Sequence, residues 1–245
     1  MLCFFGIIAC AALAFGNGDD VGDKADSTAL PLLLSEDFEQ GADRWKPTDA
    51  NVWRIVKTDR GKLYEQWKKR SQYEPPHRSP YNISLLKNTL VGDFVLTARV
   101  KNTARKAGNH RDVCLFFNYQ GPARFYYAHL GLRPDPNSSQ IMIVNDAPRK
   151  MITKNKTPGI PWDDEWHEVK VVRRVDEGTI EIYFDDMKKP NMVAIDKTFT
   201  WGQIGIGSFD DTAQWDDIKL HGQRVEKPLR RADTKIEKNT KKKTE

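Results

Sequence analysis

Two alternating stretches, residues 110–120 and 124–130, restrict the fold more than any other part of the sequence. Polar and apolar side chains alternate along both with period two, as in strands that bury one face. The turn Gly121-Pro122-Ala123 joins them, so the pattern predicts a β-hairpin. We expect Tyr119 to lie opposite Tyr126, which gathers the apolar side chains on one face. A slip by one residue would mix the two faces, so the hydrophobic pattern itself selects this pairing.

Short alternating runs bounded by turn residues recur between residues 32 and 222, and no helical stripe of apolar residues interrupts them. This succession is typical of an antiparallel two-sheet sandwich with one curved sheet. We therefore expect an all-β fold in one domain, residues 32–224. Further strands are predicted at 35–39, 52–58, 63–68, 94–101, 141–144, 168–175, 179–184, 205–208 and 215–220.

The N-terminal stretch 2–14 is apolar, uncharged and too short to span a bilayer, as in the central part of a secretory signal. We expect a signal segment at 1–14 and a flexible spacer at 15–31. Cleavage after Ala14 and lipidation at Cys10, which ends a lipobox-like sequence, both remain open. A secreted or periplasmic protein is predicted, lipid-anchored if Cys10 is modified, with no membrane-spanning segment.

The C-terminal stretch 225–245 is rich in Lys and Arg and poor in large apolar residues, so we expect a disordered basic tail. The formal net charge of +5 is concentrated there, which argues against a nucleic-acid-binding face on the folded domain. Anionic envelope polymers are a candidate partner for the tail. Once the signal is removed, Cys114 is the only cysteine, which excludes a disulfide scaffold and a Cys-rich metal site.

Several motifs resemble the strands of the concanavalin A-like jelly-roll superfamily, in its order along the chain. Gly92-Asp93-Phe94-Val95-Leu96 resembles a "GDF-x-L" strand, and residues 166–171 with 180–185 resemble a "W-x-x-V-x-V" and "I-x-V-Y-x-D" pair. Residues 204–208 and 215–220 resemble the closing strands. Within that group the chain resembles secreted bacterial proteins, abundant in planctomycetes, that are related to the 3-keto-disaccharide hydrolase domain. The resemblance implies a jelly roll that acts on or binds carbohydrate.

The second face of the predicted hairpin collects polar groups that suit sugar recognition, which uses planar hydrogen-bonding groups beside an aromatic ring. The candidate ligand-binding residues there are His110, Asp112, Asn118, Tyr127 and His129. Asp112 could also orient His110 as a general base, and the same set could hold a transition metal. Arg78, in a proline-rich loop that is not a central strand, is a further ligand-binding candidate. The alternative is that these residues only hydrate an exposed sheet face.

A structural calcium ion is a second candidate, because the resemblance implies that one joins the first and last strands. Glu39, the carbonyl of Gly41 and Asp216 would be its oxygen ligands, with Asp43 as a further candidate. The spacing of Ile218 and Leu220 places Asp216 on the core side of its strand. The alternative is a carboxylate bonded to backbone N–H groups. No organic cofactor is expected.

The catalytic carboxylates of jelly-roll glucanases, which follow one another along a single strand, have no counterpart in this sequence. The best-supported function is a secreted carbohydrate-binding sandwich that recognises a glycan on its concave sheet. One alternative is a hydrolase or lyase that acts on a 3-keto-disaccharide or another glycoside. A second alternative is a non-catalytic structural protein of the cell envelope.

Overall fold

The computed structural model describes residues 30–227. The predicted signal segment with Cys10, the spacer up to residue 29 and the tail from residue 228 lie outside the described residues. Inside them, no helix combines the length and the hydrophobicity that crossing a membrane requires.

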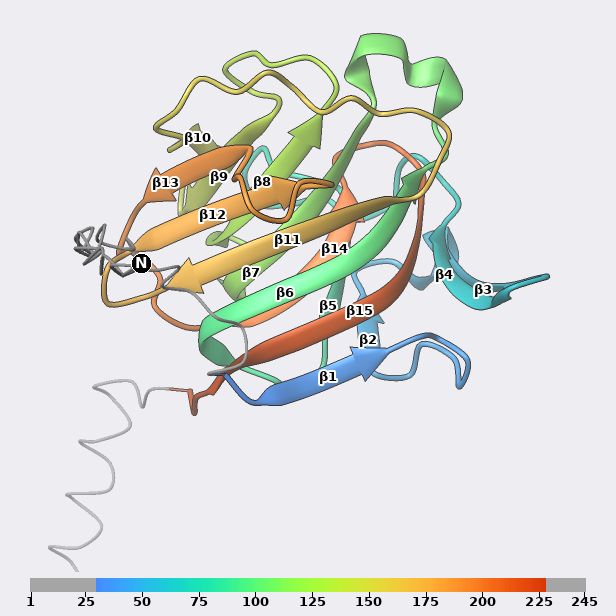
Figure 1. Cartoon of the computed structure of the whole chain (residues 1–245), viewed down its shortest axis with the longest axis horizontal. Helices are drawn as coiled ribbons and strands as arrows, with labels where there is room; N and C mark the ends of the chain where they lie inside the picture. Colours follow the sequence, from blue (N-terminus) through green and yellow to red (C-terminus); the bar gives the residue numbers. More distant parts are fainter. Residues whose placement is uncertain (1–29, 228–245) are drawn as a thin grey trace, which may run out of the picture.

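The described chain forms two antiparallel sheets that pack face to face (Figure 1), which confirms the predicted all-β sandwich. The first sheet has the order β13-β12-β11-β6-β15-β4-β3, and β1 adds to β15. Its strands are β1 (Leu32–Glu36), β3 (Trp53–Thr58), β4 (Gly61–Gln66), β6 (Val91–Asn102), β11 (His167–Arg174), β12 (Thr179–Phe184), β13 (Met192–Ile195) and β15 (Ala213–Arg224). The pairing of β1 with β15 joins the first and last strands, as the resemblance implied.

The second sheet has the order β10-β9-β8-β7-β14-β5-β2. Its strands are β2 (Trp45–Pro47), β5 (Asn82–Leu86), β7 (Asp112–Gly121), β8 (Arg124–Gly131), β9 (Gln140–Asn145), β10 (Lys150–Met151) and β14 (Gln203–Ser208). Two short helical turns, η2 (Ala50–Val52) and η3 (Arg105–His110), lie in connections. Strands β2, β5, β10 and β13 were not predicted. Strand β5 is buried along its whole length and alternates over only four residues, Asn82 to Leu85, which is a weak signal.

The main core lies between the sheets and is built from the alternating apolar side chains of their inner faces, with Leu96 and Leu220 on one side and Leu115 and Phe117 on the other. The Tyr126 hydroxyl forms hydrogen bonds between the two sheets. Tyr126 on the second sheet donates to Asp196, which follows β13, and accepts from the Phe199 N–H at 3.0 Å. The two sheets are therefore held by polar contacts as well as by apolar burial.

The hairpin of β7 and β8 exists, but Phe117, and not Tyr119, lies opposite Tyr126. A shift of two residues leaves each side chain on its predicted face, because the strand repeat is two. A bulge then follows Phe117, with Asn118 at φ 45°. This bulge turns Tyr119 to the outer face, where it packs in a second apolar cluster instead of the main core.

Candidate functional site

The outer face of the hairpin is buried, so the prediction of a solvated polar face was wrong. It carries a second apolar cluster of Ile83, Leu85, Cys114, Phe116, Tyr119, Phe125, Tyr127, Met142, Val144 and Phe209. Tyr73 and Tyr81 pack on that cluster from the proline-containing loop, and Tyr81 and Phe209 meet edge to face at 5.2 Å. A long loop therefore covers the surface on which a sugar was expected.

Two predicted ligand-binding residues do meet under this cover. His129 Nε2 lies 3.5 Å from Asp112 Oδ2, and the two side chains are almost fully buried. Cys114 is directly opposite His129 in the pairing of β7 with β8. One donor atom each from Asp112, Cys114 and His129 lies within 4.8 Å of the others, an arrangement that could hold a metal ion. Burial, and then the Asp112 charge, raise the pKa of the Cys114 thiol well above its usual range.

The other predicted ligand-binding residues are not all brought to this cluster. His110 is exposed at the end of η3, because β7 begins only at Asp112. Asn118 is fully buried at the bulge, and neither of its amide atoms has a hydrogen-bond partner among the described residues. Arg78 lies over the Phe209 ring at 5.6 Å. A ligand-binding role for these residues stays a prediction. Burial keeps Asn118 from direct contact with a surface glycan, whereas His110 and Arg78 are exposed.

Tyr127 has a partner that the sequence did not reveal. Arg149 Nη1 donates to the Tyr127 hydroxyl at 3.3 Å, and the Arg149 guanidinium lies 4.3 Å from the centre of the Phe209 ring. Arg149 follows a strand end, in a segment without periodicity, so no local signal identified it. Burial strongly raises the pKa of the Tyr127 hydroxyl, which therefore stays protonated.

The oxygen donors predicted for calcium are only partly assembled. Glu39 and Asp216 line one cavity, whereas Asp43 lines another and Gly41 lines neither. Glu39 Oε1 already accepts the Lys62 N–H at 2.6 Å, and the Lys62 ammonium donates to the Glu39 carbonyl at 2.7 Å. The positively charged Lys62 side chain therefore already lies against Glu39. This donor set does not fit a calcium ion.

The cavity shared by Glu39 and Asp216 forms at a fork in the first sheet. Strand β15 pairs with β4 at residues 213–215 and with β1 at residues 218–221, so its edge partner changes between them. Between these two paired segments, β15 has a bulge at Asp216 and Asp217, and Asp217 has a φ of 48°. Trp215 and Ile218 both face the core, so the bulge turns Asp216 outward. The core-side placement predicted for Asp216 was wrong for this reason.

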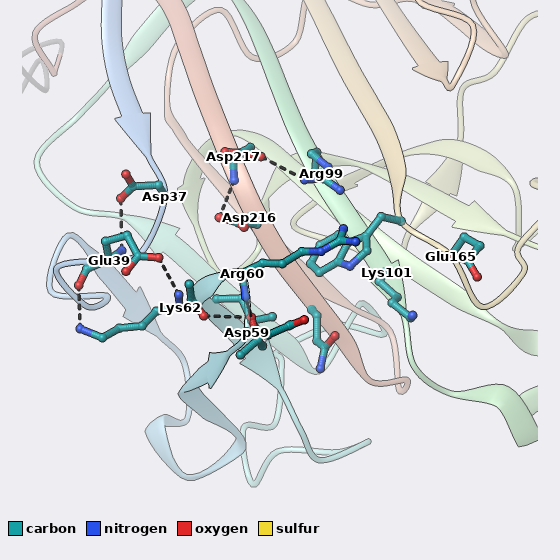
Figure 2. A pocket seen from close by; sticks show the side chains of 15 residues that line it. Asp37, Glu39, Asp59, Arg60, Lys62, Arg99, Lys101, Glu165, Asp216 and Asp217 are labelled. Atoms are coloured by element: carbon teal, nitrogen blue, oxygen red, sulfur yellow. Dashed lines mark hydrogen bonds and ion pairs between the residues drawn. The ribbon is translucent and has the colours of Figure 1, made fainter.

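Two adjoining cavities, of about 600 and 500 Å³, lie on the outer face of the first sheet, over β6, β15 and the start of β11. They share three residues, Arg99, Trp166 and Asp217, and we call the combined depression the Trp166 groove. Figure 2 shows charged side chains of both signs around the larger cavity, including Arg60 and Lys62 near the turn that joins β3 to β4. The remaining lining residues are Asp37, Glu39, Thr58, Asp59, Gly61, Leu63, Thr97, Ala98, Lys101, Glu165, His167, Glu168, Asp185, Gln214, Asp216 and Lys219.

An aromatic ring and planar hydrogen-bonding groups meet in this groove. The Arg99 guanidinium lies 5.2 Å from the centre of the Trp166 ring and forms an ion pair with Asp217 at 3.3 Å. Burial raises the pKa of the neighbouring Asp216 carboxyl, which also accepts the Asp217 N–H at 2.8 Å. The sequence placed Trp166 in a family motif but did not assign it to a site. The one indication that Trp166 could belong to a surface site was its position just before the alternating strand β11.

No protein-family model matches the chain, and no curated protein matches it. Solved structures do match. The carbohydrate binding module CBM66 from Bacillus subtilis is 18% identical, with a TM-score of 0.51, over 73% of this chain and 96% of that one. The GH43 BlXynB protein from Bacillus licheniformis is 10% identical, with a TM-score of 0.53, over 77% of this chain and 39% of that one.

These similarities show the fold. That fold is a sandwich of two antiparallel sheets, and membership of the concanavalin A-like superfamily stays a prediction. The closer relation to planctomycete proteins stays a prediction.

Proposed function

We propose that this chain is an exported carbohydrate-binding protein that holds a glycan in the Trp166 groove. The observation that carries the proposal is the meeting of Trp166, Arg99 and the Asp216–Asp217 bulge in one exposed depression. Sugar hydroxyls pair with planar carboxylate, amide and guanidinium groups, and the apolar faces of sugar rings pack on aromatic rings. The groove offers each of these partners from neighbouring strands.

The length and openness of the groove suit an extended ligand. It crosses β15 and β6 and ends beside the start of β11, so several sugar units could contact successive strands. Gln214 and Lys101 add hydrogen-bonding groups at the larger cavity. The similarity to a carbohydrate binding module of the same architecture supports this choice of ligand class.

The test is a glycan screen on the full chain, followed by calorimetric titration of the best ligand. We expect Trp166→Ala to weaken binding at least about tenfold, because the ring supplies apolar contact that no neighbour replaces. Trp67→Ala is the matched control. Trp67 is exposed (41%), whereas Trp166 is half-buried. Trp67 also lies beside a guanidinium, that of Arg54 at 5.0 Å, but it does not line the groove.

Equal binding by the wild type and Trp166→Ala would overturn the placement of the glycan, and a wild type that binds no glycan would overturn the function. The titrated samples are also analysed for sugar products. Product release by the wild type would favour the hydrolase alternative over simple recognition.

A further inference from the structure

We propose that Asp112, Cys114 and His129 bind one divalent transition-metal ion, with zinc as the best match, beneath the loop that joins β14 to β15. This inference is independent of the glycan groove, because it concerns the outer face of the other sheet. The ion would join β7 to β8, and its ligand Asp112 accepts a hydrogen bond from the Phe209 N–H of the loop.

The hairpin brings the three donors together by its register. Asp112 and Cys114 are two residues apart on β7 and share a face, and His129 on β8 is opposite Cys114. A carboxylate oxygen, a thiolate sulfur and an imidazole nitrogen are all established zinc ligands. The 3.5 Å between His129 Nε2 and Asp112 Oδ2 suits two donors that share one ion at about 2.0–2.2 Å each.

The tautomer of His129 directs a lone pair into the cluster. His129 Nδ1 lies 2.7 Å from the Asn137 carbonyl oxygen, which can only accept, so Nδ1 carries the proton. In the neutral imidazole, Nε2 then has a lone pair, and Nε2 has no hydrogen-bond partner among the described residues although His129 is only 6% exposed. An N–H bond to a backbone carbonyl opposite a free ring nitrogen is the usual support of a metal-binding histidine.

The Asp112 carboxylate is held in a matching orientation. Its Oδ1 accepts the Phe209 N–H at 2.8 Å, which leaves Oδ2 towards His129. The Asp112 N–H donates to Asp211 Oδ2, also at 2.8 Å. Asp112 is 3% exposed, and its contact with His129 is an ion pair only when the imidazole is protonated on both nitrogens. A buried carboxylate needs a compensating positive charge, which a divalent ion would supply.

The same three residues do not fit a thiol-based catalytic triad. In such a triad the imidazole joins the nucleophile and the carboxylate through different ring nitrogens. Here Nδ1 is bonded to a backbone carbonyl, and only Nε2 faces Asp112. Cys114 is fully buried, so a substrate could not reach its sulfur in this conformation.

The test uses the full chain, stripped with a chelator and titrated with Zn²⁺ alone and with Co²⁺ alone. We expect one ion per chain, a rise in melting temperature with Zn²⁺, and a near-ultraviolet thiolate charge-transfer band with Co²⁺. Cys114→Ser and Asp112→Asn should each weaken Zn²⁺ binding by at least about 100-fold. Asp112→Asn retains an oxygen that can accept the Phe209 N–H, so it tests metal binding with little change to the loop.

Two controls separate this cluster from other donors of the chain. His110→Ala removes an exposed imidazole near the hairpin, and the double variant Cys3→Ser with Cys10→Ser removes the other cysteines. Both should keep the cobalt band and the zinc-dependent rise in melting temperature. The proposal is overturned if the wild type gives neither signal, or if Cys114→Ser, shown by circular dichroism to be folded, gives both signals unchanged.

Discussion

The Arg99 guanidinium on β6 lies 5.2 Å from the centre of the Trp166 indole ring, which immediately precedes β11, and both residues line the two cavities of the groove. The same guanidinium pairs with Asp217 at 3.3 Å, so it joins the aromatic end of the groove to the bulge of β15. Arg99 thus contacts both features on which glycan binding is proposed to depend.

Replacement of Arg99 should therefore weaken glycan binding more than it weakens the fold. We expect Arg99→Ala to raise the dissociation constant about tenfold, roughly 1.4 kcal/mol. Its exposed ion pair should contribute under about 1 kcal/mol to stability. Calorimetric titration and urea unfolding measure the two effects. Arg54→Ala, which removes the guanidinium beside Trp67, is the control and should bind normally. An unchanged affinity in Arg99→Ala would contradict the prediction.

Asp216 should make glycan binding sensitive to acid. Burial raises the pKa of this carboxyl, so it loses its charge at a higher pH than an exposed aspartate. We expect affinity to fall as the pH drops through that pKa, because a protonated carboxyl accepts hydrogen bonds poorly. Asp216→Asn should remove this dependence.

The same shift makes a separate prediction for stability. A carboxyl whose pKa is raised in the folded state stabilises the fold below its unfolded pKa, and this contribution is lost as the pH rises. Acid loss of binding by this route is therefore not caused by unfolding. Circular dichroism at each pH of the titration checks this. Identical pH profiles for the wild type and Asp216→Asn would count against the assignment.

Tyr126 should support the contact between the two sheets. Tyr126→Phe removes the hydrogen bonds to Asp196 and to the buried Phe199 N–H, and we expect a loss of about 1–3 kcal/mol in urea unfolding. Burial and the bond to Asp196 raise the pKa of Tyr126 to about 12. Its stabilising contribution is complete below pH 10 and is lost as the pH rises through about 12. An equal alkaline loss in the variant would exclude Tyr126 as its source.

Gly202 should be intolerant of a side chain, because its Cβ would lie 2.2 Å from the carbonyl carbon of Asn118 in the β7 bulge. Its φ of +156° is also unfavourable for other residues. We expect Gly202→Ala to destabilise the fold by about 2–4 kcal/mol. Gly121→Ala, in open space at the hairpin turn, should change stability by under about 0.5 kcal/mol. Equal melting temperatures for the two variants would disprove the close contact.

The alternation of polar and apolar residues predicted the hairpin and the inner face of the sandwich. Every second side chain of such a strand faces the core, so apolar residues recur with a period of two. The sequence could not show that the outer face was covered too. That cover comes from Tyr73, Tyr81 and Phe209, which are far from the hairpin along the chain. A polar residue such as His129 has the same pattern whether water or a distant loop lies over it.

Bulges explain two further errors, the faces predicted for Tyr119 and for Asp216. Those at Asn118 and Asp217 each reverse the face of a neighbouring side chain, and neither changes the hydrophobic pattern beyond a local break. Asn and Asp adopt positive φ more readily than most residues, which is a weak local signal. The larger groove depends on such a bulge, so its position followed from the strand pairing and not from the local sequence.

Hydroxyl-radical footprinting with and without the bound glycan tests the central claim most directly, because it reports which side chains the ligand covers. Trp166 and Trp67 can be compared within one sample, because each is a solvent-accessible tryptophan beside an arginine. We predict that glycan protects Trp166 from oxidation and leaves Trp67 unchanged. Protection of Trp67, or of the exposed His110, with no change at Trp166 would contradict the account.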